Sequence, residues 1–460
     1  PPPSPWASPF ASESHMASPA DFPSPRADWL TVREAVDRML AGAVPLPAIS
    51  TPLSRAAGRV LAEGVVARVD LPPWDNAAMD GYALRGADLP SPIPPQGLAI
   101  AVDGEVRAGD PPRDPPPPGW AVRIMTGAPV PEGLDTVIRV EDTDGEAGSP
   151  GTVVFRSARD RGRHIRPAGQ DMRRGQPLLE PGDWLTPGRM GLLAAAGMDP
   201  VRVHPLPNVM ILPTGDELRR PREFQDVEAG FAIPESNGPV LEAACRALSL
   251  PVTFLPPAPD DDVALHESLN RTLDADVLIT LGGASMGTAD RVKSVLSERG
   301  FVLDFWRVKM RPGSPFSFGL LPRTEGVRPL PVCGLPGNPA SAFVTFLVLV
   351  RPYLLALAGR EDRHLPTDTA RAGQDLPAHP ERTQFVRVRL RRDPDGGWVT
   401  DPTGPQGSGL VQSVAAAEAL AVVPAGPEGL PTGSPVRILR LDGGMDQQEQ
   451  GYRDRSEESG

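Results

Sequence analysis

The chain has 460 residues and a formal net charge of −12 at pH 7. Its hydrophobic fraction of 40% and charged fraction of 23% are typical of folded globular proteins, and its length allows roughly three domains. The acidic balance argues against nucleic acid as a partner, because nucleic-acid binding requires a basic face.

The two ends of the chain differ in composition from the rest. Residues 1–28 are rich in proline, which predicts a disordered lead-in, and residues 443–460 are predicted to form a polar tail. No secretory-signal pattern is visible, and the longest apolar run, Ala342–Val350, is shorter than the ~20 residues that span a bilayer. The two cysteines, Cys245 and Cys333, do not make a disulfide framework. We therefore expect a cytoplasmic protein with no membrane partner.

The first predicted element is a helix that begins after Thr31. Thr31 and Glu34 have the spacing of a capping box, in which a hydroxyl and a carboxylate bind each other's backbone N–H groups. Apolar residues then recur at helical spacing, and Gly42 predicts the end of the helix.

Short strands separated by glycine and proline follow, and they predict a small β-rich domain over residues 65–165. Its clearest strands are Leu98–Val102, Trp120–Ile124 and Thr136–Val140. Residues 375–441 return to this pattern with a strand at Phe385–Leu390, which predicts a small barrel or a sandwich.

Between these β-rich regions, strands and helices alternate over residues 205–358. Apolar strands that alternate with helices predict a parallel sheet with helices on both faces. The predicted strands are Val209–Leu212, Val252–Leu255, Val277–Leu281 and Pro331–Cys333, with helices over 239–248, after Asp260, after Asp290 and from Pro339.

Three loops after these strands carry the residues that predict chemistry, because ligands bind at the carboxyl ends of strands in open parallel sheets. The loops are Leu212–Leu218, Gly282–Asp290 and Gly334–Ser341. Glycines let backbone amides approach a ligand, and a helix N-terminus after Asn338 favours an anion. Each loop taken alone is weak evidence, because a glycine after a strand is more often only a tight turn and an aspartate before a helix is usually only a cap.

Carboxylates and cations accompany these loops. Glu217, Asp260 and Asp290 beside a phosphate-binding loop predict a Mg²⁺ site, since Mg²⁺ takes a few carboxylates together with substrate phosphate. Arg307 and Arg311 alternate with Lys309, so a single strand would place all three on one face. That face predicts an anion clamp, with a solvated strand face as the alternative.

Several motifs together resemble the molybdopterin molybdenumtransferase family, which includes MoeA and the gephyrin E-domain. The resemblance covers about residues 29–441, and the motifs occur in the family's order. They are Asp75–Ala83, Arg123–Gly133, Glu141–Thr143, His164–Asp171, Pro213–Leu218, Gly282–Gly287, Arg311–Gly313, Gly334–Ser341 and Gln406–Gly409.

The resemblance implies a multidomain fold with a central doubly wound α/β domain like that of MogA. It also implies a β-rich domain inserted in an elongated linker domain, a small C-terminal β-barrel, and a homodimer whose active cleft lies between two subunits. The implied ranges are 29–64 with 166–204 for the linker domain, 65–165 for the insert, 205–358 for the α/β domain and 359–442 for the barrel.

The resemblance further implies a reaction in which molybdate enters adenylylated molybdopterin, with Mg²⁺-dependent cleavage that releases AMP. The molybdopterin adenylyltransferase is then the expected source of the substrate and a partner. The catalytic positions implied are Asp75, Thr126, Asp171, Glu217, Asp260 and Asp290. The implied substrate-binding positions are Arg166, Gly282, Gly283, Ser285, Gly287, Arg307, Arg311, Pro336, Gly337, Asn338, Pro339, Arg387 and Ser408.

The sequence departs from the family pattern at a few of these positions. Arg307, Arg311 and Ser314 stand where bacterial relatives often have lysine, and His164 and Pro167 replace a frequent asparagine and arginine. Two other functions fit parts of the sequence. An adenylyltransferase would need the central domain alone, whereas a non-catalytic scaffold would not need the acidic residues of the loops.

Overall fold

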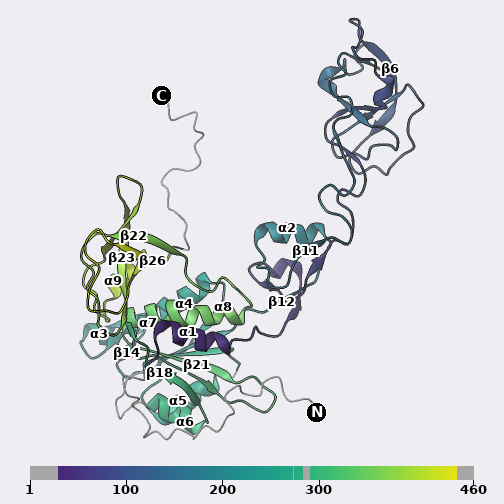
Figure 1. Ribbon diagram of the computed structural model, residues 1–460. Coiled ribbons are helices and arrows are strands. Elements are labelled where there is room, and N and C mark those ends of the chain that lie inside the picture. Colours follow the sequence, from purple (N-terminus) through teal and green to yellow (C-terminus); the bar gives the residue numbers. More distant parts are fainter. Residues whose placement is uncertain (1–28, 273, 283–290, 443–460) are drawn as a thin grey trace. The chain divides into compact units, whose positions relative to one another are not determined.

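A computed structural model describes residues 29–272, 274–282 and 291–442 (Figure 1). Within these residues the chain forms two compact units. Ser50–Ala57 and Glu63–Arg202 make up one, the β-rich unit, and the remaining described residues make up the other, the α/β unit. The predicted lead-in, the predicted tail and all of the Gly282–Asp290 loop except Gly282 lie outside the described residues.

The first helix of the α/β unit, α1 (Val32–Ala41), has the predicted capping box. The Thr31 side chain accepts the Glu34 N–H at 3.2 Å, and a Glu34 carboxylate oxygen accepts the Thr31 N–H at 2.7 Å. The helix ends at Gly42 and buries Ala35 and Met39 in the main core of this unit. The local sequence therefore determines both ends of α1.

The central sheet has six strands in the order β16-β13-β17-β21-β20-β18. The first four are parallel, as predicted, whereas β20, which was not among the predicted strands, pairs antiparallel with both β21 and β18. The strands are β13 (Val209–Pro213), β16 (Val252–Phe254), β17 (Val277–Leu281), β18 (Val302–Trp306), β20 (Ser317–Leu321) and β21 (Leu330–Leu335).

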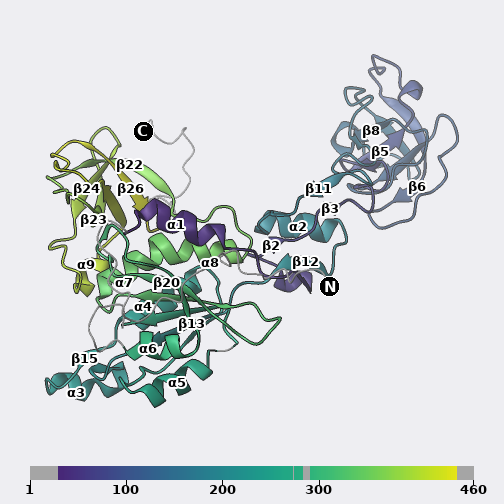
Figure 2. The same ribbon diagram turned by 60° about the horizontal axis from the view of Figure 1, so that its bottom comes forward.

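Helices cover both faces of this sheet, as predicted (Figure 2). Alternate residues of β17 enter two cores: Val277 and Ile279 pack with one set of helices, and Leu278 packs with the other. The first set is α1, α4 (Asn237–Ala247), α7 (Pro339–Thr345) and α8 (Arg351–Leu357), and the second is α5 (Asp262–Asn270) and α6 (Arg291–Glu298).

The helices α7 and α8 are joined by a π-helical turn, η7 (Phe346–Val350), into one stretch over Pro339–Leu357. This stretch has a mean hydropathy of 1.9 and is long enough to cross a membrane by length and composition alone. However, 78% of its apolar window is buried inside the protein. An all-round apolar helix is equally typical of a protein core, and this one packs against the central sheet.

The C-terminal strands close into a five-stranded barrel, which decides between the barrel and the sandwich left open by the sequence. The ring closes because β23 pairs with both β24 and β25, and β19 adds to its edge. The elements are β19 (Met310–Arg311), β22 (Thr367–Ala372), β23 (Thr383–Arg392), β24 (Trp398–Pro402), β25 (Ala419–Val423) and β26 (Pro435–Arg440), with α9 (Val411–Ala415).

The β-rich unit centres on a five-stranded sheet in the order β8-β5-β7-β6-β9. The sheet packs one face around Val122 and Ile124 and the other around Tyr82 and Phe155, so both faces are covered. Its strands are β5 (Gly81–Leu84), β6 (Leu98–Val106), β7 (Ala121–Ile124), β8 (Thr136–Arg139) and β9 (Thr152–Phe155).

Short elements complete the two units. Those of the β-rich unit are β3 (Val65–Val66), β4 (Asn76–Ala77), β10 (Ile165–Arg166), β11 (Pro177–Leu179) and α2 (Pro187–Ala195), with 3-10 turns Leu53–Arg55, Gly86–Asp88 and Val140–Asp142. Those of the α/β unit are β2 (Val60–Leu61), β14 (Leu218–Arg219), α3 (Phe224–Glu228) and β15 (Ile233–Pro234), with a 3-10 turn at Pro221–Glu223. The strands β1 (Ile49–Thr51) and β12 (Val201–His204) span the unit boundaries.

An ion-pair cluster around the buried carboxylate of Asp160 stabilises the β-rich unit. Arg139 Nε donates to Asp160 at 2.9 Å, and His164 Nε2 lies 3.1 Å from the same carboxylate. Burial raises the pKa of Asp160, but the hydrogen bonds from Arg139 and His164 outweigh burial and lower the pKa to about 2. The ordinary pKa of an aspartate is about 3.9. The cluster therefore contributes its full stability above about pH 4 and loses it as the pH falls towards about 2.

We expect Asp160→Asn to lower the free energy of unfolding by about 1–3 kcal/mol at pH 7, because it leaves Arg139 with a weakened buried partner. The variant should also lose part of the stability change that wild type shows between about pH 4 and about pH 2. Thermal unfolding across this pH range measures both effects. Asp114→Asn, at an exposed loop position, is the matched control. Equal pH profiles for wild type and Asp160→Asn would rule out this role.

Candidate functional site

The loops after the parallel strands meet at the carboxyl edge of the central sheet. Thr214 follows β13, and its N–H and hydroxyl both donate to the Leu281 carbonyl of β17, at 2.9 and 3.2 Å. Gly282 N–H donates in turn to the Leu335 carbonyl of β21 at 3.3 Å. Three predicted loops are thus tied to one another by hydrogen bonds between neighbouring strands.

Gly282 is required at its position for two reasons. Its φ of +94° is in the left-handed region, and a Cβ built there would lie 2.8 Å from the Thr214 carbonyl oxygen. Gly337 is also close to Gly282, since a Cβ built at Gly337 would lie 3.9 Å from the Gly282 Cα. The backbones of two predicted substrate-binding loops therefore come close at Gly282 and Gly337.

Two further segments reach the Gly337 loop. Asn237, the first residue of α4, donates its Nδ2 to the Gly337 carbonyl at 2.6 Å. The Ser408 carbonyl of the barrel accepts the Ala340 N–H at 2.9 Å, one residue after Pro339. The structure therefore brings together Asn338, Pro339 and Ser408, three of the implied substrate-binding positions, and it adds Asn237, which lies two residues before the predicted helix over 239–248.

An acidic cluster lies on the same edge of the sheet. Asp260 N–H donates to an Asp216 carboxylate oxygen at 3.1 Å, and the Glu217 carboxylate folds back over Gly215. Burial raises the pKa of Asp260, and the negative charges of Asp216 and Glu217 raise it further. A bound cation would relieve the repulsion between these neighbouring negative charges.

These carboxylates have the oxygen donors that Mg²⁺ prefers, and they crowd negative charge beside the glycine loops, so they fit that ion. Within residues 29–272, 274–282 and 291–442, no group of three His, Cys, Asp or Glu side chains is arranged to hold a metal ion. The third predicted ligand, Asp290, lies outside the described residues, as do Gly283, Ser285 and Gly287. The described donors Glu217 and Asp260 would thus need substrate phosphate to complete the coordination.

The predicted anion clamp has a different geometry. Strand β18 ends at Trp306, and Arg307 has a φ of +70°, so the chain turns there and the three basic residues do not alternate along one strand. The Arg307 guanidinium lies over the rings of Trp29, at 4.6 Å, and Trp306, at 4.1 Å. Arg311 is exposed on the separate strand β19. The prediction of a one-faced basic strand was therefore wrong.

Arg387 does not present its guanidinium on a surface. It is fully buried in the barrel, where Nε donates to Ser413 Oγ at 2.7 Å and Nη2 to the Gly407 carbonyl at 3.0 Å. Burial lowers its pKa. Arg387, an implied substrate-binding position, therefore supports the 406–408 loop, which carries Ser408, from inside the barrel.

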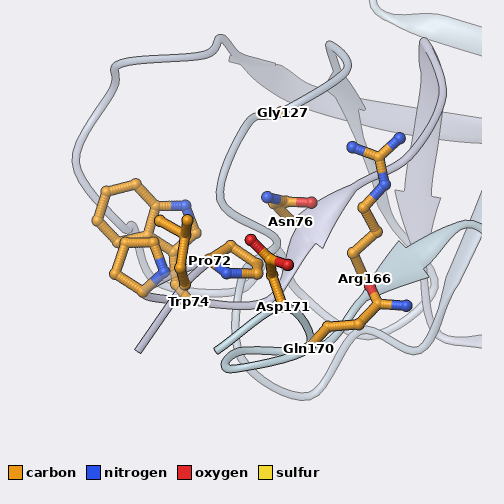
Figure 3. Close-up of a pocket in the computed structure, with 9 residues that line it drawn as sticks. Pro72, Trp74, Asn76, Gly127, Arg166, Gln170 and Asp171 are labelled. Atoms are coloured by element: carbon orange, nitrogen blue, oxygen red, sulfur yellow. The ribbon is translucent and has the colours of Figure 1, made fainter. Parts of the chain in front are cut away.

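In the β-rich unit, a hollow of about 550 Å³ brings together Arg166 and Asp171 (Figure 3). Arg166 pairs with Asn76 across strands β10 and β4, and the Asp171 N–H is held by the Leu71 carbonyl at 2.9 Å. The other residues that line the hollow are Leu71, Pro72, Pro73, Trp74, Asn76, Gly127 and Gln170. Two predicted functional residues thus share one open hollow.

Asp75 and Thr126 lie next to this hollow rather than on its lining. Asp75 accepts the Ala168 N–H at 2.7 Å and so holds the loop between Arg166 and Asp171. Thr126 donates both its N–H and its hydroxyl to Asp80, each at 2.7 Å. These hydrogen bonds lower the pKa of Asp80. Asp80, which lies inside the Asp75–Ala83 motif, thereby holds Thr126 in place and was not among the predicted site residues.

The domain composition of the chain matches that of a known family. Residues 30–197 match the MoeA N-terminal region (domain I and II), residues 210–356 a probable molybdopterin binding domain, and residues 369–441 the MoeA C-terminal region (domain IV). The molybdopterin molybdenumtransferase of Haemophilus influenzae is 35% identical over 390 residues, which cover 83% of this chain and 91% of the relative. The chain belongs to the molybdopterin molybdenumtransferase family. This family consists of transferases, so the chain is an enzyme of that class.

Other members and solved structures agree. The molybdopterin molybdenumtransferase of Synechococcus elongatus is 34% identical over 420 residues, which cover 90% of this chain and all of the relative. A crystal structure of the MoeA molybdopterin biosynthesis protein from Pyrococcus horikoshii has a TM-score of 0.71 at 26% identity, covering 90% of this chain and 100% of that one. The central α/β domain, the β-rich insert and the C-terminal barrel are thus those of the family, as the motifs implied.

Proposed function

We propose that this enzyme inserts molybdate into adenylylated molybdopterin, with Mg²⁺-dependent cleavage of the adenylate, to give molybdenum cofactor and AMP. This would be the last common step of molybdenum cofactor biosynthesis. Membership in the molybdopterin molybdenumtransferase family supports the transfer of molybdenum. One observation supports the adenylylated substrate and the Mg²⁺-dependent cleavage: Gly282 and Gly337 lie close together beside the carboxylates of Asp216, Glu217 and Asp260.

The glycine loops would bind the substrate through backbone groups. A left-handed Gly282 and a close Gly337 leave room for a phosphate or a planar ring against the main chain. Thr214 fixes the first loop by donating twice to the Leu281 carbonyl, so little reorganisation is needed on binding. Ser408, carried by the barrel loop that Arg387 supports, would border the same space.

Glu217 and Asp260 would hold Mg²⁺ together with the phosphates of the substrate, and Asp290 is the third proposed ligand. When bound, the ion supplies positive charge that neutralises the phosphoanhydride as its bond breaks. Arg311, exposed on β19, is the cation proposed to attract molybdate.

The hollow in the β-rich unit of one subunit would contribute residues to the substrate site of a second subunit. We propose a homodimer in which Arg166 and Asp171 of one subunit complete the site at Glu217 of the other. Mixing two inactive variants, Asp171→Asn and Glu217→Gln, then restores about a quarter of wild-type activity, because random pairing puts one intact site in half of the dimers. Activity measured after co-refolding tests this. No recovery, with dimers shown to exchange, would contradict a shared site.

The product formed separates this proposal from an adenylyltransferase of similar fold. The enzyme is incubated with either adenylylated molybdopterin or molybdopterin plus ATP, with Mg²⁺ in both reactions. Release of AMP from the first substrate supports the proposal, whereas pyrophosphate from ATP would indicate the adenylyltransferase. We propose that this adenylyltransferase is a separate partner that supplies the substrate. The two buried free cysteines are compatible with a reducing, cytoplasmic setting for both enzymes.

A further inference from the structure

Asn237 is held firmly at the start of α4. The next residue, Gly238, would place a Cβ only 2.1 Å from the Phe254 ring of β16, so the first turn of the helix packs directly against the sheet. Glu235 adds a second restraint, because its Oε1 accepts the Gly238 N–H at 2.8 Å. The backbone at Asn237 therefore has little freedom to move.

The carboxamide of Asn237 is oriented as well. Its Nδ2 donates to the Gly337 carbonyl at 2.6 Å, and this bond fixes the opposite side of the amide plane, where Oδ1 lies. Oδ1 is buried and has no hydrogen-bond partner within the described part of the chain. A second acceptor, Glu235 Oε2, is also buried without a partner there. Buried acceptors are almost always paired in native proteins, so these two call for a donor that the described part of the chain does not provide.

The position of Asn237 indicates where that donor comes from. Gly337, which Asn237 holds, lies beside Gly282, at the meeting point of the two loops assigned to substrate. A carbonyl oxygen can only accept, so it selects an N–H or O–H group. The proposed substrate carries N–H donors on both of its heteroaromatic rings, the adenine and the pterin.

We propose that Asn237 recognises the substrate. Its Oδ1 accepts a hydrogen bond from an N–H group on one of the heteroaromatic rings of the substrate, while its Nδ2 keeps the Gly337 loop in place. This inference rests on the proposed function, because that function supplies the ligand. It assigns specificity to a residue outside the glycine loops and the acidic cluster.

Equilibrium binding to the intact enzyme tests the proposal with three probes. These are AMP, purine riboside 5′-monophosphate, which is AMP without the 6-amino group, and molybdopterin under anaerobic conditions. Each is titrated into wild type, Asn237→Ala and Asn270→Ala, and thermal unfolding is measured for each protein. Asn270 is an exposed asparagine at the end of α5, so its substitution is the matched control.

Loss of one hydrogen bond to a buried acceptor should weaken binding by about five- to tenfold. If Asn237 reads adenine, wild type prefers AMP to its deamino analogue by this factor, and Asn237→Ala loses the preference. If it reads the pterin, molybdopterin binding weakens in Asn237→Ala but not in Asn270→Ala. The comparison of the two nucleotides on wild type needs no variant and is independent of any folding defect.

Two outcomes would overturn the proposal, and they are distinguishable. If wild type binds the probes but Asn237→Ala binds AMP and molybdopterin within twofold of wild type, Oδ1 is satisfied by water and has no reading role. If wild type binds neither AMP nor molybdopterin, the proposed function itself fails, and the inference fails with it.

Discussion

Glu217→Gln should lower the rate of molybdate-dependent AMP release by on the order of 100-fold, because it removes a proposed Mg²⁺ ligand beside the glycine loops. Glutamine keeps the size and shape of the side chain but not its charge. Glu217 is exposed, so the fold should be unaffected. The same change also relieves part of the repulsion on Asp260, whose pKa is raised by burial and by the neighbouring Asp216 and Glu217 carboxylates.

The measurement is the rate of AMP release at several Mg²⁺ concentrations. A lost metal ligand raises the Mg²⁺ concentration needed for half-maximal rate, whereas an unrelated defect lowers the rate at every concentration. Glu228→Gln, at an exposed position on α3, is the matched control and should behave as wild type. Wild-type activity and Mg²⁺ dependence in Glu217→Gln would show that the metal assignment is wrong.

The second large effect is expected for Gly282→Ala. A left-handed backbone costs an alanine about 1–2 kcal/mol, and the new Cβ would lie 2.8 Å from the Thr214 carbonyl oxygen and 2.9 Å from its hydroxyl. The loop must shift to relieve this contact, which breaks the approach of Gly282 to Gly337. We therefore expect a lower unfolding temperature together with a loss of activity on the order of 100-fold.

The Gly326→Ala variant separates the backbone strain expected in Gly282→Ala from the steric contact of the new Cβ. Gly326 has a φ of +83° but open space around its Cβ position, so alanine there is strained without a steric contact. It should lower stability by the backbone cost alone and leave activity unchanged. If Gly282→Ala loses no more activity than Gly326→Ala, the close approach at Gly282 has no part in substrate binding.

Elements whose signals are local could be predicted from the sequence. The capping box of Thr31 and Glu34 determines the start of α1, and the apolar strand Val277–Leu281 determines the centre of the sheet. The loop glycines could be predicted too, because a glycine directly after a buried strand is both a turn and an approach point. These signals require only neighbouring residues, which the sequence provides.

Features that depend on distant partners could not be predicted. Nothing local to Ser317–Leu321 shows that it pairs antiparallel with β21 and so ends the parallel part of the sheet. The burial of Arg387 depends on Ser413 and Gly407, which close over it from other parts of the barrel. Asn237 has the pattern of an ordinary helix start, and only its bond to Gly337, a hundred residues away, places it at the site.

The arrangement of Arg307 shows a third kind of failure. Alternation of Arg307 with Lys309 and Arg311 predicts one strand, but Arg307 has a left-handed backbone and packs on two tryptophan rings. Aromatic contacts with the guanidinium stabilise this turn. One of the tryptophans, Trp29, precedes the first helix, so the competing interaction is not visible near Arg307 in the sequence.

The most direct test of the account is reconstitution of a cofactor-free molybdoenzyme. The purified protein is incubated with adenylylated molybdopterin and Mg²⁺, with and without molybdate, and AMP release is measured beside the recovered molybdoenzyme activity. We predict that molybdate accelerates AMP release and that active molybdoenzyme forms only when molybdate is present. Binding of the adenylylated substrate without AMP release, or AMP release that never yields an active molybdoenzyme, would contradict the assignment.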